Sequence, residues 1–182
     1  MARVFLSVGS NLGDRLALLR QAVERLRQLH DVEFLEASPV YKTEPWEEHP
    51  GRVADPDEWF FNCVVAIETS LPPKTLLAEL QGIERGLGRE RGAGTPEDRR
   101  YQRRRLDIDI LCYGETVVSA TEQLNIPHLL MHERAFVLRP LADLAPDWEH
   151  PTLHQTVREL LADLDDDHEV QMTELPRRWY ER

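Results

Sequence analysis

Two aspartates, Asp107 and Asp109, stand two positions apart within an apolar stretch, RLDIDILCYG at 105–114. The stretch predicts a β-strand, in which residues two apart point to the same face. Two adjacent carboxylates repel each other, and a divalent cation such as Mg²⁺ relieves that repulsion because it prefers carboxylate oxygen as a ligand. The pair therefore indicates a metal site, and a solvated strand face with two unrelated acids is the alternative.

An arginine-rich stretch comes directly before this pair. Residues 84–105 contain eight arginines and four acids, a local charge of +4 in a chain whose net charge is −11. Guanidinium groups match phosphate oxygens, and phosphoryl transfer relies on a metal ion together with such cations. A solvated, salt-bridged loop is the alternative for part of these arginines. Nucleic-acid binding is disfavoured by the overall acidity and by the scarcity of aromatic residues around Tyr101.

An asparagine, Asn62, lies within a second apolar stretch, WFFNCVVAIET at 59–69. In a strand it shares a face with Phe60, while Cys63 takes the opposite face. An amide offers donors and an acceptor to the edge of a heterocycle, and a phenyl ring beside it can stack on that heterocycle. A half-buried asparagine at a strand end is the alternative. Cys63 and Cys112 are interpreted as packing residues.

Other polar residues carry weaker signals. His128 can donate to a phosphate group, although an ordinary surface histidine is an equal alternative. The segment GSNLGD at 9–14 lacks the spacing of a phosphate-binding loop and is interpreted as a turn between a strand and a helix. The acidic run at 163–167 is interpreted as a solvated tail, because it lacks the glycine and the final glutamate of a calcium loop.

The order of the expected elements is β-α-β-β-α-β over the first ~113 residues, which predicts an α/β (α+β) protein with a ferredoxin-like core. This core is an antiparallel sheet with helices on one face, and the C-terminal third forms an α/β appendage. The other face of the sheet would be left for a ligand and two long loops, 43–58 and 88–104. The predicted strands are 3–9, 32–42, 59–69 and 105–114, and the predicted helices follow Asp14 and Pro72, with a last one at 153–164.

The composition restricts the class of protein. A chain of 182 residues, 41% of them hydrophobic, buries a core without needing disulfides. The net charge argues against general binding to nucleic acid or anionic membranes, and no apolar run approaches the ~20 residues of a membrane span. Two cysteines and the lack of a signal-peptide pattern lead us to expect a cytoplasmic protein. We expect one domain at 1–164 and a polar, peripheral tail at 165–182.

Four blocks of the sequence resemble the 6-hydroxymethyl-7,8-dihydropterin pyrophosphokinase family of the folate pathway. They follow the family's order and span roughly residues 3–160. The last block is long and specific, which makes it the strongest part of the resemblance. The blocks are FLSVGSNLGDR (5–15), VYKTEPW (40–46) with FFNCVVAIET (60–69), ELQGIERGLGRER (79–91), and RRLDIDILCYG (104–114) continuing through NIPHLLMHERAFVLRPLADLAP (125–146).

The resemblance implies a reaction and a set of site residues. It implies a ferredoxin-like fold, and transfer of the β,γ-pyrophosphoryl group of ATP to the hydroxymethyl oxygen of the pterin, leaving AMP. It also implies two Mg²⁺ ions, ATP as co-substrate, no nucleic-acid or membrane partner, and a monomer. The matching positions are Arg89, Arg104, Asp107 and Asp109 for catalysis, with the two aspartates as metal ligands; Glu84, Arg89, Arg104, His128 and Arg134 for ATP; and Thr43, Pro45, Trp46, Phe60, Asn62, Asp107 and Phe136 for the pterin.

In this interpretation the two long loops are lids that exclude water from the substrates, and Tyr101 is the candidate aromatic residue that seals the site. Activation of the pterin oxygen by Mg²⁺, in place of a side-chain base, is our hypothesis. Two rival functions stay open. Another two-metal enzyme, such as a nucleotidyl transferase or nuclease, would release pyrophosphate or cleave nucleic acid. In a non-catalytic binding module the two aspartates would be incidental.

Overall fold

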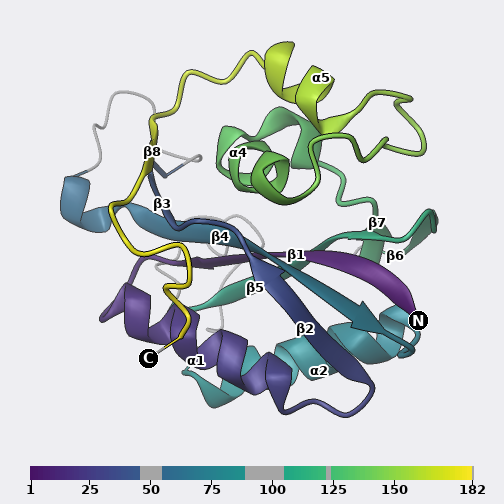
Figure 1. The fold of residues 1–182 in the computed structure, drawn as a ribbon, viewed down its shortest axis with the longest axis horizontal. Helices are drawn as coiled ribbons and strands as arrows, with labels where there is room; N and C mark the ends of the chain where they lie inside the picture. Colours follow the sequence, from purple (N-terminus) through teal and green to yellow (C-terminus); the bar gives the residue numbers. More distant parts are fainter. Residues whose placement is uncertain (46–54, 89–104, 122–123, 182) are drawn as a thin grey trace.

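An antiparallel sheet forms the middle layer of the structure (Figure 1). The computed structural model of the chain describes residues 1–45, 55–88, 105–121 and 124–181. The strand order is β5-β1-β4-β3-β8, and β2 pairs with the same edge of β4 as β3 does. The strands of this sheet are β1 (Ala2–Ser10), β2 (Val32–Ala37), β3 (Tyr41–Thr43), β4 (Phe60–Thr69), β5 (Asp107–Tyr113) and β8 (Val170–Met172).

Two helices, α1 (Arg15–Arg27) and α2 (Pro73–Gly86), cover one face of the sheet (Figure 1). The side chain of Asp14 begins α1 by accepting a hydrogen bond from the backbone N–H of Ala17 at 2.9 Å. The apolar stripes of both helices pack on alternate residues of β1, β4 and β5 in the larger core cluster. This βαββαβ arrangement confirms the predicted ferredoxin-like core with helices on one face.

A second helical layer, made of α4 (Ala135–Leu144) and α5 (Val157–Ala162), covers much of the opposite face (Figure 1). Leu138 and Leu141 of α4 pack there against Val64 of the sheet. The expectation that this face is left for loops and a ligand is therefore wrong where α4 lies. The sequence concealed α4 because Pro140, a residue that normally breaks helices, stands inside it. The hairpin β6 (Val118–Thr121) and β7 (Leu124–Ile126) and two short 3-10 helices, η1 (Pro56–Glu58) and η2 (Met131–Glu133), complete the described elements.

The predicted strand at 32–42 is divided into β2 and β3. The break falls at Ser38 and Pro39, because Pro39 has no N–H with which to continue the ladder. Ser38 keeps the segment attached to β4: its N–H donates to the Val64 carbonyl at 2.8 Å, and its Oγ accepts from the Val64 N–H at 2.9 Å. The short strand β3 that results places Thr43 directly opposite Phe60 of β4.

The C-terminal segment packs on the sheet, which corrects the expectation that residues 165–182 are peripheral. Strand β8 pairs with β3, and Trp179 is only 1% exposed. The Trp179 indole N–H donates to the Ser38 carbonyl at 2.8 Å, and its own carbonyl accepts from Arg20 at 2.7 Å. A single buried tryptophan among polar neighbours has no periodicity, so the pattern of the tail did not predict its burial. The domain boundary at 164 stays a prediction.

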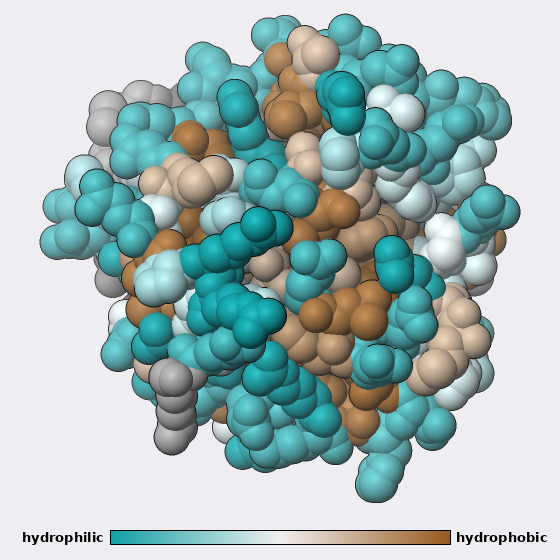
Figure 2. Space-filling view, in the orientation of Figure 1, coloured by the Kyte–Doolittle hydropathy of each residue, from teal (hydrophilic) through white to brown (hydrophobic). Residues whose placement is uncertain are grey.

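The surface seen in the orientation of Figure 1 carries both apolar and polar residues. Figure 2 shows apolar residues near its centre and polar residues around them. Among the helices formed by the described residues, none has the length and apolar character needed to cross a membrane.

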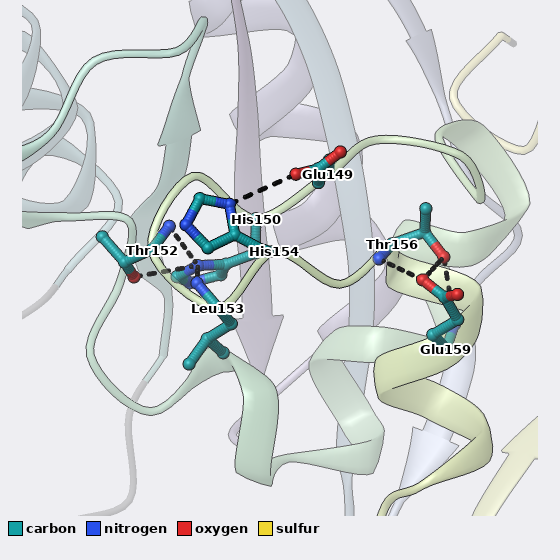
Figure 3. A network of polar contacts seen from close by, with 7 residues as sticks. All are labelled: Glu149, His150, Thr152, Leu153, His154, Thr156 and Glu159. Carbon is teal, nitrogen blue, oxygen red and sulfur yellow. Dashed lines mark hydrogen bonds and ion pairs between the residues drawn. The ribbon is translucent and has the colours of Figure 1, made fainter.

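The connection between α4 and α5 is a turn whose hydrogen bonds converge on His150 (Figure 3). His150 Nδ1 accepts from the backbone N–H groups of Thr152 and Leu153 at 3.4 and 3.3 Å, which requires that nitrogen to be unprotonated. Burial lowers the pKa of His150, and the nearby His132 lowers it further. The turn ends at Thr156, whose capping box with Glu159 starts α5 later than the predicted residue 153.

Acidification is expected to destabilise the ligand-free protein in part through His150. Its folded pKa lies below the ordinary value of 6.5, so its contribution is complete above about pH 6.5 and is lost as the pH falls through the folded pKa. His150→Asn retains an acceptor and cannot titrate. Between about pH 7.5 and pH 5.5, urea unfolding should show a smaller loss of unfolding free energy for this variant than for wild type. Equal losses would contradict this assignment.

Candidate active site

One residue from each of four strands forms a row across the sheet: Tyr41 of β3, Asn62 of β4, Gly9 of β1 and Asp107 of β5. Residues that pair directly in an antiparallel sheet point to the same face. Asp109 follows two positions later on that face, so the predicted alignment of the two carboxylates is confirmed. The face is the one that α4 covers farther along β4, because β4 residues of the same parity pack against α4.

Gly9 lies between Asn62 and Asp107 in this row, and the Asn62 side chain crosses it. Its strand separates β4 from β5, and adjacent strands lie about 4.8 Å apart, so roughly 10 Å separates the two backbones. A Cβ at Gly9 would stand 2.3 Å from Asn62 Oδ1, closer than real Cβ contacts, and 3.9 Å from the Phe60 ring. Gly9 is therefore the site residue that the sequence analysis missed, because only the register shows what lies over it.

The Asn62 amide has a fixed orientation. Its side-chain nitrogen donates to Thr43 Oγ1 at 2.6 Å, and the residue is 5% exposed. Thr43 is itself 1% exposed and lies in β3, beside Phe60 in the register. The predicted partnership of Asn62, Thr43 and Phe60 thus has a structural basis, and Pro45 follows two residues after Thr43 at the end of the described segment.

The other predicted ring, Phe136, comes from the first turn of α4 and is half-buried. The Arg134 guanidinium lies 5.6 Å from the centre of this ring, a cation–π contact that links a predicted ATP residue to a predicted pterin residue. Phe60 and Phe136 therefore belong to different layers, one to the sheet and one to the helix that packs on it.

His128 lies near Asp107 and is attached to β5. Its backbone N–H donates to the Leu111 carbonyl of β5 at 2.8 Å, and its Nδ1 accepts from the Leu130 N–H at 3.3 Å. Burial and the positive charge of Arg134 lower the pKa of His128 to about 4, against an opposing effect of the Asp107 carboxylate. The ring is consequently neutral at pH 7 with its proton on Nε2, which makes that atom a hydrogen-bond donor.

Glu84 reaches β5 from the opposite, helix-covered side. Its carboxylate accepts a hydrogen bond from the Ile108 N–H at 2.9 Å, and the residue is 2% exposed. Ile108 stands between the two aspartates, so Glu84 holds the strand segment that presents them. This anchoring of the strand is what the structure shows for Glu84, and its predicted contact with ATP stays a prediction.

Removing the Glu84 carboxylate is expected to destabilise the protein. Glu84→Ala leaves the buried Ile108 N–H without this acceptor, at a cost of about 1–3 kcal/mol of unfolding free energy. Glu84→Gln keeps an acceptor oxygen and should lose less. Urea unfolding measures both, with the exposed Glu79→Ala on the same helix as control. If Glu84→Ala were as stable as the control, this anchoring role would be wrong.

Several predicted residues lie outside the described residues. They are Trp46, Arg89, Tyr101 and Arg104, together with most of both long loops. The structure therefore brings together Asp107, Asp109 and His128 on one side of Gly9, and Asn62 with Thr43 and Phe60 on the other. A carboxylate pair, a neutral donor and an amide near one another on this part of the fold suit a ligand that combines phosphates with a polar ring.

Comparison with known proteins points to one family. The sequence model of the 7,8-dihydro-6-hydroxymethylpterin-pyrophosphokinase family (HPPK) matches residues 5–146. A protein of Methylorubrum extorquens named 2-amino-4-hydroxy-6-hydroxymethyldihydropteridine pyrophosphokinase is 44% identical over 166 residues, which cover 91% of this chain and 95% of that protein. A Porphyromonas gingivalis protein of the same name is 42% identical over 154 residues, covering 83% and 95%.

The solved structures agree on the fold. A crystal structure of Plasmodium falciparum HPPK-DHPS with pterin and p-hydroxybenzoate superposes with a TM-score of 0.64 at 18% identity. The match covers 88% of this chain and 41% of that one, so this chain spans less than half the length of the solved protein. At this identity the likeness concerns the fold alone.

Proposed function

The chain belongs to the 7,8-dihydro-6-hydroxymethylpterin-pyrophosphokinase family, and it transfers the pyrophosphoryl group of ATP to hydroxymethyldihydropterin in folate biosynthesis. We propose that this reaction takes place over the sheet face that carries Asp107, Asp109 and Asn62. Transfer of the two terminal phosphates of ATP leaves AMP. The observation that supports this placement is the row across the strands, with the carboxylates on one side of Gly9 and the amide on the other.

The two aspartates fit Mg²⁺. Both are partly exposed, both lie on one face of β5, and both offer the hard oxygen ligands that Mg²⁺ prefers. Bound there, two Mg²⁺ ions would neutralise phosphate charge and favour ionisation of the pterin hydroxyl. The chain itself holds the two ligands in a fixed position, because Glu84 binds the backbone N–H of Ile108, the residue between them.

The phosphates of ATP would meet donors on the β5 side of the site. His128 Nε2 donates without carrying a charge, since its pKa is about 4. Arg134 adds a positive charge, and Arg89 and Arg104 are the other arginines that we propose bind the triphosphate.

The pterin would occupy the β4 side. Asn62 presents an amide whose orientation is fixed by Thr43, which suits the hydrogen-bonding edge of the ring. Phe60 and Phe136 would supply the two aromatic faces, and Pro45 and Trp46 are the remaining residues that we assign to the pterin. We assign Asp107 to both the metal ions and the pterin, because only one strand, β1 with Gly9, lies between Asp107 and Asn62.

The proposal includes a monomer in the cytoplasm. Cys63 and Cys112 are both buried free thiols, which is in keeping with a reducing compartment. Burial raises the pKa of both thiols, so neither is a reactive nucleophile.

Product analysis tests the proposal. The protein is incubated with ATP and Mg²⁺, with and without 6-hydroxymethyl-7,8-dihydropterin, and the nucleotide products are separated. We expect AMP to form only when the pterin is present. ADP, free pyrophosphate as the product, or no product from folded protein would overturn it.

A further inference from the structure

A strap of the C-terminal segment, residues 165–173, joins the two layers that contribute to the site. In Figure 1 it runs from the end of α5, past the start of α4, to the edge of the sheet at β8. The sequence predicts a polar, peripheral segment here, and the residues of the strap belong to none of the predicted site positions. Its contacts are nevertheless specific at both ends.

The upper contact is made by Asp166 at the start of α4. Its carboxylate accepts from the Ala135 N–H at 2.7 Å and from the His168 N–H at 3.1 Å, and its other close partner is the His168 ring at 2.6 Å. The Asp166 side chain is 3% exposed. A carboxylate in this position satisfies an N–H that the helix leaves free and interacts favourably with the helix dipole.

The helix needs this acceptor because its own cap residue does not supply one. Helices usually begin with Ser, Thr, Asp or Asn, but α4 begins after Arg134, whose side chain makes no capping hydrogen bond. Arg134 and Phe136 flank Ala135, and both are assigned to the substrates. Asp166, 31 positions away in sequence, therefore provides the cap at the residue between them.

The lower contact is made with β3. The Glu44 N–H donates to the Glu169 carbonyl at 2.9 Å, and the Glu169 N–H donates to the Glu44 carboxylate at 3.2 Å. Thr43 then pairs with Val170 in the sheet. Within five residues, 166–170, the strap thus binds both the helix that carries Phe136 and the strand that orients Asn62.

We propose that Asp166 is a positioning residue for substrate binding: by capping α4 at Ala135 it fixes Arg134 and Phe136 against the strand that holds Thr43. This inference rests on the proposed function, since it concerns the same site. The residue contacts neither substrate, and its effect reaches them through the first turn of α4.

Steady-state kinetics of Asp166→Ala provide the test. We expect KM for ATP and for the pterin to rise about tenfold, a change of about 1.4 kcal/mol in binding, while kcat changes less than threefold. Asp166→Asn retains an acceptor for the Ala135 N–H and should restore most of the loss. The neighbouring Asp165→Ala, an exposed residue, is the matched control and should behave as wild type.

Amide hydrogen exchange on the ligand-free variants provides a readout that needs no turnover. Asp166→Ala should speed exchange at residues 134–138 relative to Asp165→Ala. Unchanged KM values with active wild type, or unchanged exchange, would overturn the inference and leave the proposed function standing. A lower kcat with unchanged KM values would show a merely structural role and would also overturn it. If the wild-type protein forms no AMP, the proposed function is wrong, and the inference that rests on it is wrong as well.

Discussion

Asp109→Ala is expected to abolish AMP formation while leaving the fold intact. Asp109 and Asp107 are the acidic pair on the open part of the β5 face, and one carboxylate cannot provide the same set of metal ligands as two. Metal stabilisation of phosphoryl transfer contributes several kcal/mol, and about 4 kcal/mol corresponds to roughly a thousandfold in rate. We therefore expect turnover to fall by about three orders of magnitude or more.

The fold should survive because the substitution leaves the apolar side chains that anchor β5 in place. Ile108 and Ile110 pack in the larger core cluster, and Leu111 packs under α4. Removing one of two adjacent like charges also relieves repulsion in the metal-free protein. Thermal unfolding should therefore show a midpoint equal to or above that of wild type.

The matched control is Glu115→Ala, an exposed acid just beyond the same strand. It should retain wild-type turnover. Asp109→Asn should also lose most of the rate, since a neutral amide oxygen binds Mg²⁺ more weakly than a carboxylate does. Raising the Mg²⁺ concentration should recover part of the Asn variant's activity. Wild-type turnover in Asp109→Ala would show that the aspartate pair is not the metal site.

Local periodicity predicted much of this site because it depends on which face of a strand a residue takes. The alternation along 105–114 correctly placed both aspartates on one face, and the alternation along 59–69 correctly joined Asn62 to Phe60. Both inferences need only the geometry of one strand. The order of strands and helices likewise sufficed for the ferredoxin-like core.

What sequence alone could not show depends on contacts between distant segments. Gly9 looked like part of a turn, and its importance follows from the Asn62 side chain that crosses it. Asp166 looked like one of several solvated acids, and its role depends on an N–H 31 positions earlier. Trp179 is buried by partners more than a hundred residues away. None of these pairings leaves a periodic trace in the sequence.

Gly9→Ala is expected to raise KM for the pterin at least about tenfold, with little change in KM for ATP. The new methyl group would stand 2.3 Å from Asn62 Oδ1, so one of the two must move. Asn62 cannot move freely, because it is 5% exposed and bonded to Thr43 at 2.6 Å. The amide would lose the orientation that we assign to pterin recognition, while the donors on the β5 side would stay in place.

A double-mutant cycle separates this mechanism from a general loss of stability. Asn62→Ala alone should also weaken pterin binding far more than ATP binding. Once Asn62 is alanine, the methyl group at position 9 loses its short contact with the amide and keeps only an ordinary contact with Phe60, so adding Gly9→Ala should cause little further loss. Gly86→Ala is the matched control, because a Cβ there meets nothing within 4 Å.

The outcome of the cycle decides where the pterin lies. Strong non-additivity, confined to the pterin KM, would mean that Gly9 acts through Asn62 and that the β4 side of this sheet face is the pterin side of the site. Additive losses, or equal losses for both substrates, would mean that the methyl group disturbs β1 itself, and the assignment of Asn62 to the pterin would be wrong. Because Asp107 pairs with Gly9 on the other side, an effect on ATP would be the first sign of that disturbance.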